Sequence, residues 1–383
     1  MNQTLPEKSN GRSAASCSML VSPQNYYGEV PASVFTISLL AHATYRANLS
    51  CSLLKPLLSI CILFLVGSPL ALAGMNTLPQ PDIHDKTVAT TNSSCRQNDS
   101  LALVALYNAT NGPTWTNTWD LSQPMESWFG VILDTEGCVQ EIDLNYNGLT
   151  GEIPVGLMAV SNLQTLNLSF NTSLTGEIPT EIGQLAFLET LNFARTGLSG
   201  SIPLEIWNLT NLRNLNLSST WVGGNIPPEI GNLTELETLN LSSVYAVGGN
   251  FNGELPLELG SLTKMRSLSL YNNNFTGVIP PELSNLANLE SLRLHNNGFT
   301  GSIPAELGSL TKLRFLWLAA NNISGQIPPE IGSLQELRQL ALYDNNLTGS
   351  LPPELGELSE LVSLNCRDNQ LSGCFPLTLS ALC

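Results

Sequence analysis

A repeat with a period of 24 residues constrains this chain more than any other feature of its sequence. The segment NLANLESLRLHNNGFTGSIPAELG, residues 285–308, recurs with small changes from about Val139 onwards. The pattern is L-x-x-L-x-L-x-x-N-x-L-x-G-x-I-P. The second position of its L-x-L is filled at Leu144, Leu168, Phe193, Leu217, Leu241, Leu270, Leu294, Leu318, Leu342 and Cys366. Such a period predicts a solenoid, in which each coil buries its apolar side chains only against neighbouring coils.

Two intervals depart from the 24-residue spacing. The interval from Leu168 to Phe193 is 25 residues, and we interpret Ser173 as the insertion. The interval from Leu241 to Leu270 is 29 residues, and we expect residues 244–249 to bulge out of the array. The repeat therefore has ten units, with an irregular fifth one.

Each unit carries a strand signal followed by an asparagine. Leu292 and Leu294 alternate with polar residues, which predicts a short strand with its leucines turned inward. Three residues after Leu294, we expect the Asn297 amide to pair with backbone groups that the turning chain leaves unsatisfied. Thr196 and Thr220 replace this asparagine in two units, and Val244 cannot hydrogen-bond in the fifth. The equivalent asparagines are Asn147, Asn171, Asn273, Asn321, Asn345 and Asn369.

Roughly from Cys95 to Cys383, the chain resembles the plant-type leucine-rich repeat family. The resemblance rests on the repeat and on the segment L-x-G-x-I-P-x-E-[IL]-G, as in residues 323–332 with one extra proline. It implies an α/β-type solenoid, a right-handed superhelix with a parallel β-sheet on its concave face, about ten repeats and a cap at each end. Similar proteins include receptor-like kinase ectodomains and polygalacturonase-inhibiting proteins, which implies that the concave face binds partners.

Residues 1–73 are interpreted as a leader that ends in a signal peptide. Residues 55–73 supply a lysine, an apolar run over 57–66, a Gly-Ser-Pro break and the pair Ala71-x-Ala73. This pattern predicts secretion with cleavage after Ala73. The apolar run is shorter than the roughly 20 residues needed to cross a membrane, so we expect no stable membrane insertion after cleavage. Because the signal lies far from Met1, we hypothesise that translation begins near Leu53 or Leu54 and that the true signal covers about 53–73.

The remaining chain divides into a flexible linker (74–94), an N-terminal cap (95–138), the repeats (139–373) and a C-terminal cap (374–383). In the N-terminal cap, residues 98–100 are expected to begin a helix over 101–107. An aromatic group then follows, which we expect to cover the first coil: Trp115, Trp119, Trp128 and Phe129. The alternative is that Trp115 and Trp119 bind sugar, but the cap also explains the neighbouring helix.

Five cysteines follow the expected cleavage site: Cys95, Cys138, Cys366, Cys374 and Cys383. Cys366 occupies an inward leucine position of the repeat and is predicted to be a buried thiol. We then expect Cys95 to pair with Cys138 and Cys374 with Cys383, with one disulfide in each cap. Spacing alone does not establish this connectivity.

The chain is strongly acidic, with a formal net charge of -16. Residues 1–73 hold four basic and two acidic residues, so the rest carries -18. Such a surface repels phosphates, and we exclude nucleic acid as a partner. Much of the acid follows I-P-x or L-P-x in register, at Glu181, Glu205, Glu229, Glu258, Glu282, Glu306, Glu330 and Glu354. We interpret this stripe as a solvated face that keeps the array soluble, in preference to a cation site.

The sequence contains no signal for enzymatic chemistry. His295 is the single histidine of the repeats, and no Cys or His residues stand at metal-ligand spacing. No nucleophile elbow or phosphate-binding glycine loop is found, because the glycines occupy turn positions of the repeat. We therefore predict a protein that is not an enzyme and has no cofactor.

A candidate binding patch lies on the outward positions of units six to nine. The first five units place mostly Asn, Thr and Ser there, whereas the later units place Tyr271, Arg293, His295, Phe315, Trp317, Tyr343 and Asp344. Large aromatic side chains and arginine dominate binding energy at interfaces. The competing interpretation is that strand propensity alone favours aromatic residues at these positions.

These observations predict a monomeric, secreted or cell-surface recognition module that binds a protein, peptide or glycan on its concave face without calcium. One alternative, taken from the resemblance, is an inhibitor of an extracellular wall-degrading enzyme. Another is an ice-binding or structural extracellular protein, because some similar repeats bind ice and a column of hydroxyls precedes the repeat glycine. The column consists of Thr150, Thr175, Ser199, Thr276, Thr300, Ser324, Thr348 and Ser372.

Overall fold

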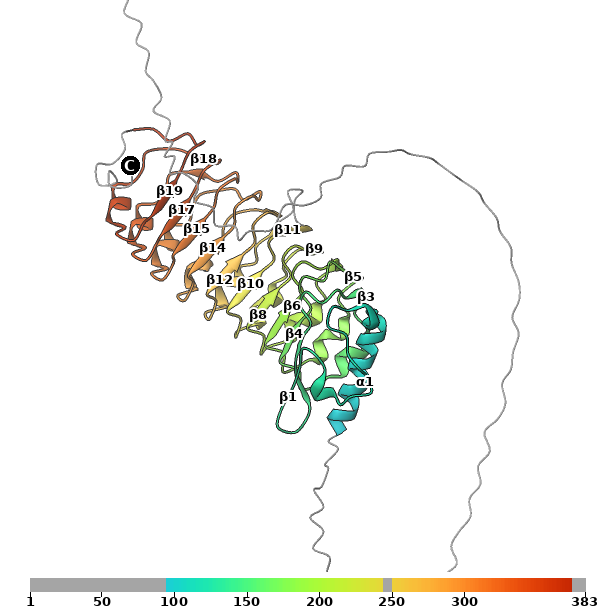
Figure 1. Cartoon of the computed structure of the whole chain (residues 1–383). Helices are drawn as coiled ribbons and strands as arrows, with labels where there is room; N and C mark the ends of the chain where they lie inside the picture. Colours follow the sequence, from blue (N-terminus) through green and yellow to red (C-terminus); the bar gives the residue numbers. More distant parts are fainter. Residues whose placement is uncertain (1–93, 244–249, 374–383) are drawn as a thin grey trace, which may run out of the picture. The chain divides into compact units, whose positions relative to one another are not determined.

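Each coil of the solenoid contributes one short strand to a long sheet (Figure 1). The computed structural model describes residues 94–243 and 250–373. Neighbouring coils pair in parallel with leucine beside leucine, so that Leu292 lies between Leu268 and Leu316. The parallel strands are β2 (Val139–Asp143), β4 (Thr165–Asn167), β6 (Thr190–Asn192), β8 (Asn214–Asn216), β10 (Thr238–Asn240), β12 (Ser267–Ser269), β14 (Ser291–Arg293), β15 (Phe315–Trp317), β17 (Gln339–Ala341) and β19 (Ser363–Asn365). This order confirms the predicted solenoid and its ten units.

On the other side, each of the first nine coils carries a short 3-10 helix, and many coils carry a second short strand. The backbone turns at the second residue after the inward leucine pair, which has a positive φ angle, as at Asn296 and Ala320. The proline of the I-P segment then stands directly before the helix, as Pro304 does before η9. The helices are η3 (Val155–Ala159), η4 (Thr180–Gln184), η5 (Leu204–Asn208), η6 (Pro228–Asn232), η7 (Leu257–Ser261), η8 (Pro281–Asn285), η9 (Ala305–Ser309), η10 (Pro329–Ser333) and η11 (Pro353–Glu357). The second strands are β3 (Thr150–Glu152), β5 (Ser173–Thr175), β7 (Ser199–Ser201), β9 (Trp221–Gly224), β11 (Asn250–Glu254), β13 (Asn274–Thr276), β16 (Ser324–Gly325) and β18 (Asn346–Leu347).

Close packing of successive 3-10 helices explains the glycine of the E-[IL]-G segment. A Cβ atom added to Gly308 in η9 would lie 2.4 Å from the carbonyl oxygen of Glu330 in η10. A real carbon atom cannot approach so closely, so only glycine allows the coils to stack at this spacing. The acidic stripe lies on these helices, where Glu330 stands in the first turn of η10.

The N-terminal cap covers the first coil with a helix and an antiparallel strand. The helix α1 (Ser94–Ala109) packs against η3, and β1 (Val131–Leu133) pairs antiparallel with β2. Two short 3-10 helices connect them, η1 (Gly112–Thr114) and η2 (Met125–Ser127). The predicted helix start at residues 98–100 was wrong. Asp99 lies inside α1, and its carboxylate accepts the backbone N–H of Val139 at 2.7 Å, so it is held by a tertiary contact.

Three of the four predicted aromatic residues form the core of the cap. Trp115 and Trp119 pack edge to face with 4.9 Å between ring centroids, and Trp119 stacks on Trp128 at 5.0 Å. All three are buried, and each indole N–H donates to a backbone carbonyl of the cap. Their burial contradicts the sugar-binding alternative for Trp115 and Trp119. Phe129 departs from the prediction because its side chain is 47% exposed.

The repeat asparagines form a hydrogen-bonded ladder through the array. In Asn321, the amide nitrogen donates to the carbonyls of Leu294 and Leu318 at 3.1 and 3.0 Å, and the amide oxygen accepts the N–H of Phe299 at 3.1 Å. One side chain thus joins two coils. The same pattern is made by Asn171, Asn273, Asn297, Asn345 and Asn369.

The threonine substitutions keep only part of this pattern. Thr196 and Thr220 donate to the carbonyls of Phe193 and Leu217, three residues earlier, at 2.8 Å in both cases. A hydroxyl is too short to reach the preceding coil as well. The predicted bulge, residues 244–249, lies outside the described residues.

The cysteines of the described residues occupy two kinds of position. Cys95 and Cys138 form a disulfide between α1 and the residue before β2, with 5.6 Å between their Cα atoms. Cys366 is a buried thiol at the inward position of the last coil. Cys374 and Cys383 lie outside the described residues, as do the leader and most of the linker. Among the described helices, none combines the length and apolar character that crossing a membrane requires.

Replacing the ladder asparagine Asn321 with alanine should destabilise the array by at least about 2 kcal/mol, because two carbonyls and one N–H lose their partner in the interior. Denaturant unfolding would measure this loss, with protein made without glycosylation because Asn322 begins an Asn-x-Ser acceptor sequence. The neighbouring Asn322 is exposed, so Asn322→Ala should change stability by less than about 0.5 kcal/mol. Equal effects of the two substitutions would contradict the role of the ladder.

Removing the cap disulfide should loosen the first coils selectively. Closing a loop of 43 residues stabilises the folded chain by about 4 kcal/mol in the chain-entropy description. The variant Cys95→Ser/Cys138→Ser should therefore show faster amide hydrogen exchange in α1 and β2 than the wild type, with exchange in β15 and β17 unchanged. Uniform acceleration along the array would indicate that the cap does not act locally.

Candidate functional site

The candidate patch is built by the outward positions of four adjacent strands. Because side chains alternate along a strand, the inward leucines of β14 and β15 leave their neighbours facing away from the core. Arg293 lies opposite Trp317, and Trp317 lies opposite Ala341 in β17, as the predicted register requires. Tyr271 and His295 follow β12 and β14 at equivalent places. The fold thus places side chains that are 24 residues apart in the sequence next to one another on adjacent strands.

Five of the seven predicted residues form one continuous cluster, defined here as the aromatic patch. The His295 ring stacks on Tyr271, with 4.5 Å between centroids and 10° between planes, and meets Trp317 edge to face at 5.3 Å. The Arg293 guanidinium carbon lies 4.7 Å from the Trp317 centroid and 5.5 Å from that of Phe315. Cation–π contacts of this kind hold the guanidinium against the rings.

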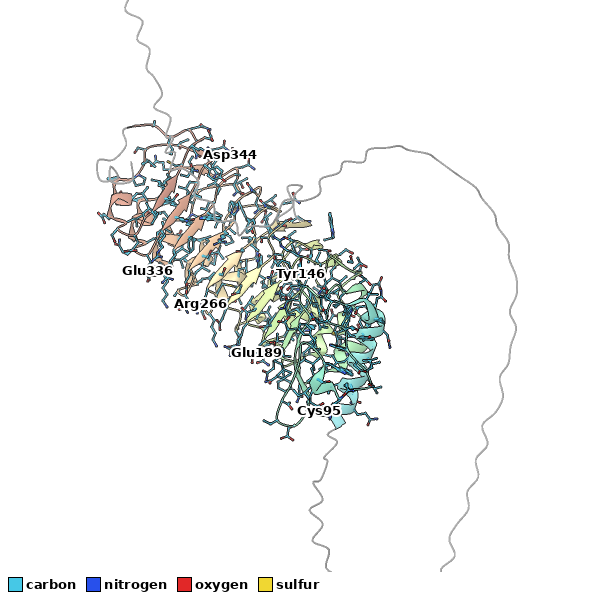
Figure 2. All side chains as sticks on the ribbon, viewed as in Figure 1. Cys95, Tyr146, Glu189, Arg266, Glu336 and Asp344 are labelled. Atoms are coloured by element: carbon cyan, nitrogen blue, oxygen red, sulfur yellow. A yellow bond between two sulfur atoms is a disulfide. The ribbon has the colours of Figure 1, made fainter. Side chains whose placement is uncertain are left out.

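The other two predicted residues lie beside the patch. Tyr343 contacts Arg367 of the last coil, whose guanidinium carbon is 5.3 Å from the ring centroid. Arg367 was not predicted, although it occupies the same repeat position as Tyr343 in the next coil. Asp344 follows Tyr343 and is exposed. Figure 2 shows it at the margin of the sheet opposite to the one where Glu336 lies.

The strand β14 and the residue two positions after its end contain three polar atoms without hydrogen-bond partners among the described residues. They are Ser291 Oγ, Arg293 Nε and His295 Nδ1, and all three atoms are buried. Burial, helped by the neighbouring Arg293 charge, lowers the pKa of His295 from 6.5 to about 4. The imidazole is therefore neutral over most of the pH range, which favours its stacking on Tyr271. Buried polar atoms without partners are uncommon in folded proteins and mark this strand as unusual.

A row of alternating charges, which the sequence reading missed, follows one margin of the long sheet. Arg213 lies 3.3 Å from Glu189 and 3.4 Å from Glu237, and Arg314 lies between Glu290 and Glu336. Arg266 bonds to Glu290 at 2.5 Å and lowers the pKa of that carboxyl. Figure 2 shows Glu189, Arg266 and Glu336 along this margin. The signal was available in the sequence as Glu and Arg alternating at one repeat position.

A second aromatic group, also missed, stands at the opposite margin in the first coils. Tyr146 and Phe170 have ring centroids 6.3 Å apart, and the Arg195 guanidinium carbon lies 5.4 Å from the Phe170 centroid. Tyr146 is 75% exposed. All three residues have positive φ angles, which are 52° for Tyr146, 60° for Phe170 and 54° for Arg195. A positive φ is unfavourable for the backbone of residues with large side chains.

Potential metal ligands are sparse in the described part of the chain. The carboxylates of the acidic stripe sit on successive 3-10 helices and do not converge on a common point. One group does bring three donor atoms within 4.8 Å of one another, and it consists of Cys95, Asp99 and Cys138 in the cap. The two cysteines of this group are joined by the disulfide.

Comparisons with known proteins agree with this geometry. The profile of a leucine-rich repeat region matches residues 131–305, and shorter leucine-rich repeat profiles match residues 287–330 and 336–358. No curated protein matches the chain by sequence. Among solved structures, a plant ice-binding protein is 30% identical with a TM-score of 0.65, and the match covers 74% of this chain and 89% of that protein.

Two Arabidopsis receptor ectodomains are also similar. The ectodomain of the receptor kinase GASSHO1/SCHENGEN3 from Arabidopsis thaliana, solved in complex with CASPARIAN STRIP INTEGRITY FACTOR 2, is 32% identical with a TM-score of 0.65; the match covers 73% of this chain and 36% of that one. The receptor kinase HAESA, solved with the peptide hormone IDA and the co-receptor SERK1, is 28% identical with a TM-score of 0.56, covering 73% and 55%. The chain thus spans about a third to a half of these ectodomains. It belongs to the plant-type leucine-rich repeat family.

Proposed function

We propose that the protein is an extracellular recognition module that binds a peptide, or an extended segment of a protein, across the aromatic patch. The observation that carries this proposal is the continuous contact of Tyr271, His295, Trp317, Arg293 and Phe315 on the outward side of β14 and β15. Packing inside the coils does not require these side chains, because the inward leucines already fill the core.

The surrounding surface suits a partner that lies along the array. At the strand position of Trp317, the earlier strands β6, β8 and β10 place Asn192, Asn216 and Asn240, whose amides bind the backbone of their own coil. Aromatic anchors beside a polar tract resemble the buried core and polar rim of protein interfaces. The peptide-bound HAESA ectodomain supports this ligand class over a glycan.

Extracellular location is part of the same proposal. The similar receptor structures are ectodomains, the cap contains a disulfide, and the leader has the pattern of a signal peptide. Inhibition of a wall-degrading enzyme is a special case in which the partner is that enzyme, and an inhibition assay with purified enzymes would identify it. The non-enzymatic character of the module is also part of the proposal.

An ice-binding role is the second candidate, favoured by the similar plant ice-binding protein. The hydroxyl column that suggested it is partly used within the fold. Thr300 donates to the carbonyl of Gly277 at 3.1 Å, and Thr175, Ser199, Ser324 and Ser372 make the equivalent bond to the preceding coil. Exposed carboxylates at Glu152, Glu177 and Glu254 also interrupt this face. We therefore favour binding of a peptide or protein partner over ice binding. Thermal hysteresis measured with the purified protein would favour ice binding instead.

The substitution Trp317→Ala should weaken binding of the partner by more than about 1 kcal/mol while leaving the fold intact, because Trp317 is the centre of the patch and stands outside the core. Partners would first be captured from native extracellular medium with the wild-type protein and their affinities measured by titration. Asn216→Ala, at the equivalent position of β8, is the matched control and should have little effect. Unfolding of the Trp317 variant, or unchanged binding, would assign the patch a structural role.

Binding should depend on pH through His295. Its imidazole should titrate with a midpoint of about 4 in an NMR experiment, and at about 6.5 in the denatured chain. Since the folded pKa lies below the unfolded one, stability due to the neutral ring is fully present above pH 6.5 and is lost as pH falls towards 4. Partner affinity should be constant above pH 5 and decrease below pH 4, because protonated His295 then places a second positive charge beside that of Arg293. His295→Gln should abolish this acid dependence; an unchanged profile would exclude His295 from the site.

A further inference from the structure

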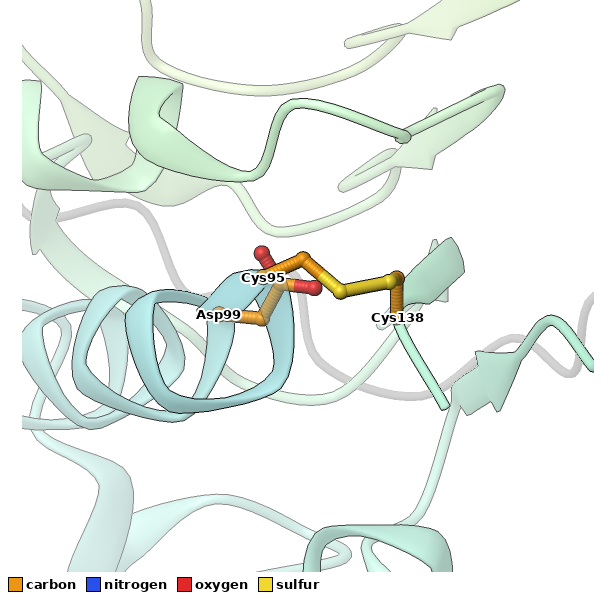
Figure 3. A group of neighbouring side chains, drawn as sticks. All are labelled: Cys95, Asp99 and Cys138. Carbon is orange, nitrogen blue, oxygen red and sulfur yellow. A yellow bond between two sulfur atoms is a disulfide. The ribbon is translucent and has the colours of Figure 1, made fainter. Parts of the chain in front are cut away.

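The disulfide of the N-terminal cap has a buried carboxylate beside it. Asp99 follows Cys95 by one helical turn of α1, and Cys138 precedes β2 (Figure 3). The two sulfur atoms and one carboxylate oxygen all lie within 4.8 Å of one another. Figure 3 shows the carboxylate extending from α1 to the Cys95 side chain. The cluster is separate from the aromatic patch and plays no part in the proposed recognition.

Only one oxygen of Asp99 has an evident structural use. The residue is completely buried, and Oδ2 accepts the backbone N–H of Val139 at 2.7 Å. The other oxygen, Oδ1, is buried and has no hydrogen-bond partner among the described residues. Burial raises the pKa of this carboxyl, so keeping Asp99 ionised in the folded protein costs free energy. An asparagine could accept the Val139 N–H equally well, so the structural role does not account for a carboxylate.

We propose that Cys95, Cys138 and Asp99 form a binding site for Zn²⁺ when the two cysteines are reduced, so that a metal ion can close the cap in place of the disulfide. Thiolate sulfur and carboxylate oxygen are both ordinary zinc ligands, and three protein ligands leave a fourth tetrahedral position for water. The disulfide then links α1 to β2 when the cysteines are oxidised, and the bound zinc ion links them when the cysteines are reduced.

The exchange needs one external reactant, a dithiol reductant, and balances with it. A dithiol reductant supplies two electrons and two protons to the disulfide, which yields two thiols, and the reductant becomes a cyclic disulfide. Zn²⁺ then binds as both thiols release their protons, and the Asp99 carboxylate supplies the third ligand. Two thiolates and one carboxylate leave the site with a net charge of -1.

The electrostatic surroundings favour a cation at this place. Cys95 lies in the first turn of α1, where the helix N-terminus stabilises a thiolate. The Asp134 carboxylate accepts the N–H of Cys138 at 2.9 Å and contributes to raising the pKa of Asp99, so a second negative charge lies near. The nearest arginine in the helix, Arg96, is paired with Glu126. A bound cation would therefore relieve repulsion between carboxylates.

Cobalt binding to the full-length protein would test the site, because Co²⁺ bound by thiolates gives an intense charge-transfer absorption. The reduced wild type should bind Co²⁺ with this absorption, Zn²⁺ should displace it, and Zn²⁺ should raise the melting temperature of the reduced protein. The oxidised protein should show neither effect. Cys374→Ser/Cys383→Ser and Cys366→Ser, which leave the cap intact, should bind as the wild type does.

The decisive variant is Asp99→Asn, which keeps an acceptor for the Val139 N–H but removes the anionic ligand. It should weaken Zn²⁺ binding by at least about tenfold, since changes in even the outer shell of metal sites have that effect. Its oxidised form should melt as the wild type does, which shows that the cap folds. Absorption that survives in Cys95→Ser/Cys138→Ser, Zn²⁺ affinity that is unchanged in Asp99→Asn, or no absorption in the reduced wild type would overturn the proposal.

Discussion

The structure depends on how each coil satisfies its backbone as the chain turns away from the sheet. After the first coil, each strand of the long sheet ends after three residues, so carbonyl and amide groups are left in the interior at every turn. The side chain of Asn321 and its equivalents provide a donor for two of these carbonyls and an acceptor for one N–H. Because each amide joins its own coil to the preceding one, the same interaction fixes both the turn and the stacking.

The outward strand positions lie outside both the leucine core and the asparagine ladder. The side chain between the two leucines can therefore differ from coil to coil: Asn216 accepts a backbone N–H of its own coil, whereas Trp317 at the equivalent position joins the aromatic patch. In β6 to β10 this residue is asparagine, whereas it is Arg293 in β14 and Trp317 in β15. Function in a solenoid of this kind is therefore specified by residues that the period does not constrain.

The period accounts for what the sequence predicted well. Strand positions, register and the burial of Cys366 follow from it, because every coil repeats one environment. The neighbours in the aromatic patch were also predictable, since parallel pairing places Arg293 beside Trp317. The helix start in the cap was not, because Asp99 takes part in a contact 40 residues away instead of capping the helix. Outside the repeat, local signals compete with tertiary contacts that no spacing reveals.

Because charges of opposite sign alternate along the sheet margin, the effect of losing coils depends on whether an odd or an even number is lost. Glu189, Arg213, Glu237, Arg266, Glu290 and Arg314 occupy one repeat position with alternating sign, so each of the four inner members has an opposite charge in both neighbouring coils. Exposed ion pairs contribute little stability. Loss of one inner coil from this stretch would nevertheless place like charges side by side, whereas loss of two adjacent inner coils would restore the alternation. Beyond Glu290 the acids come from another repeat position, where Glu336 pairs with Arg314 and Glu360 with Arg338. Growth or shrinkage of this stretch by pairs of coils is thus less disruptive than by single ones.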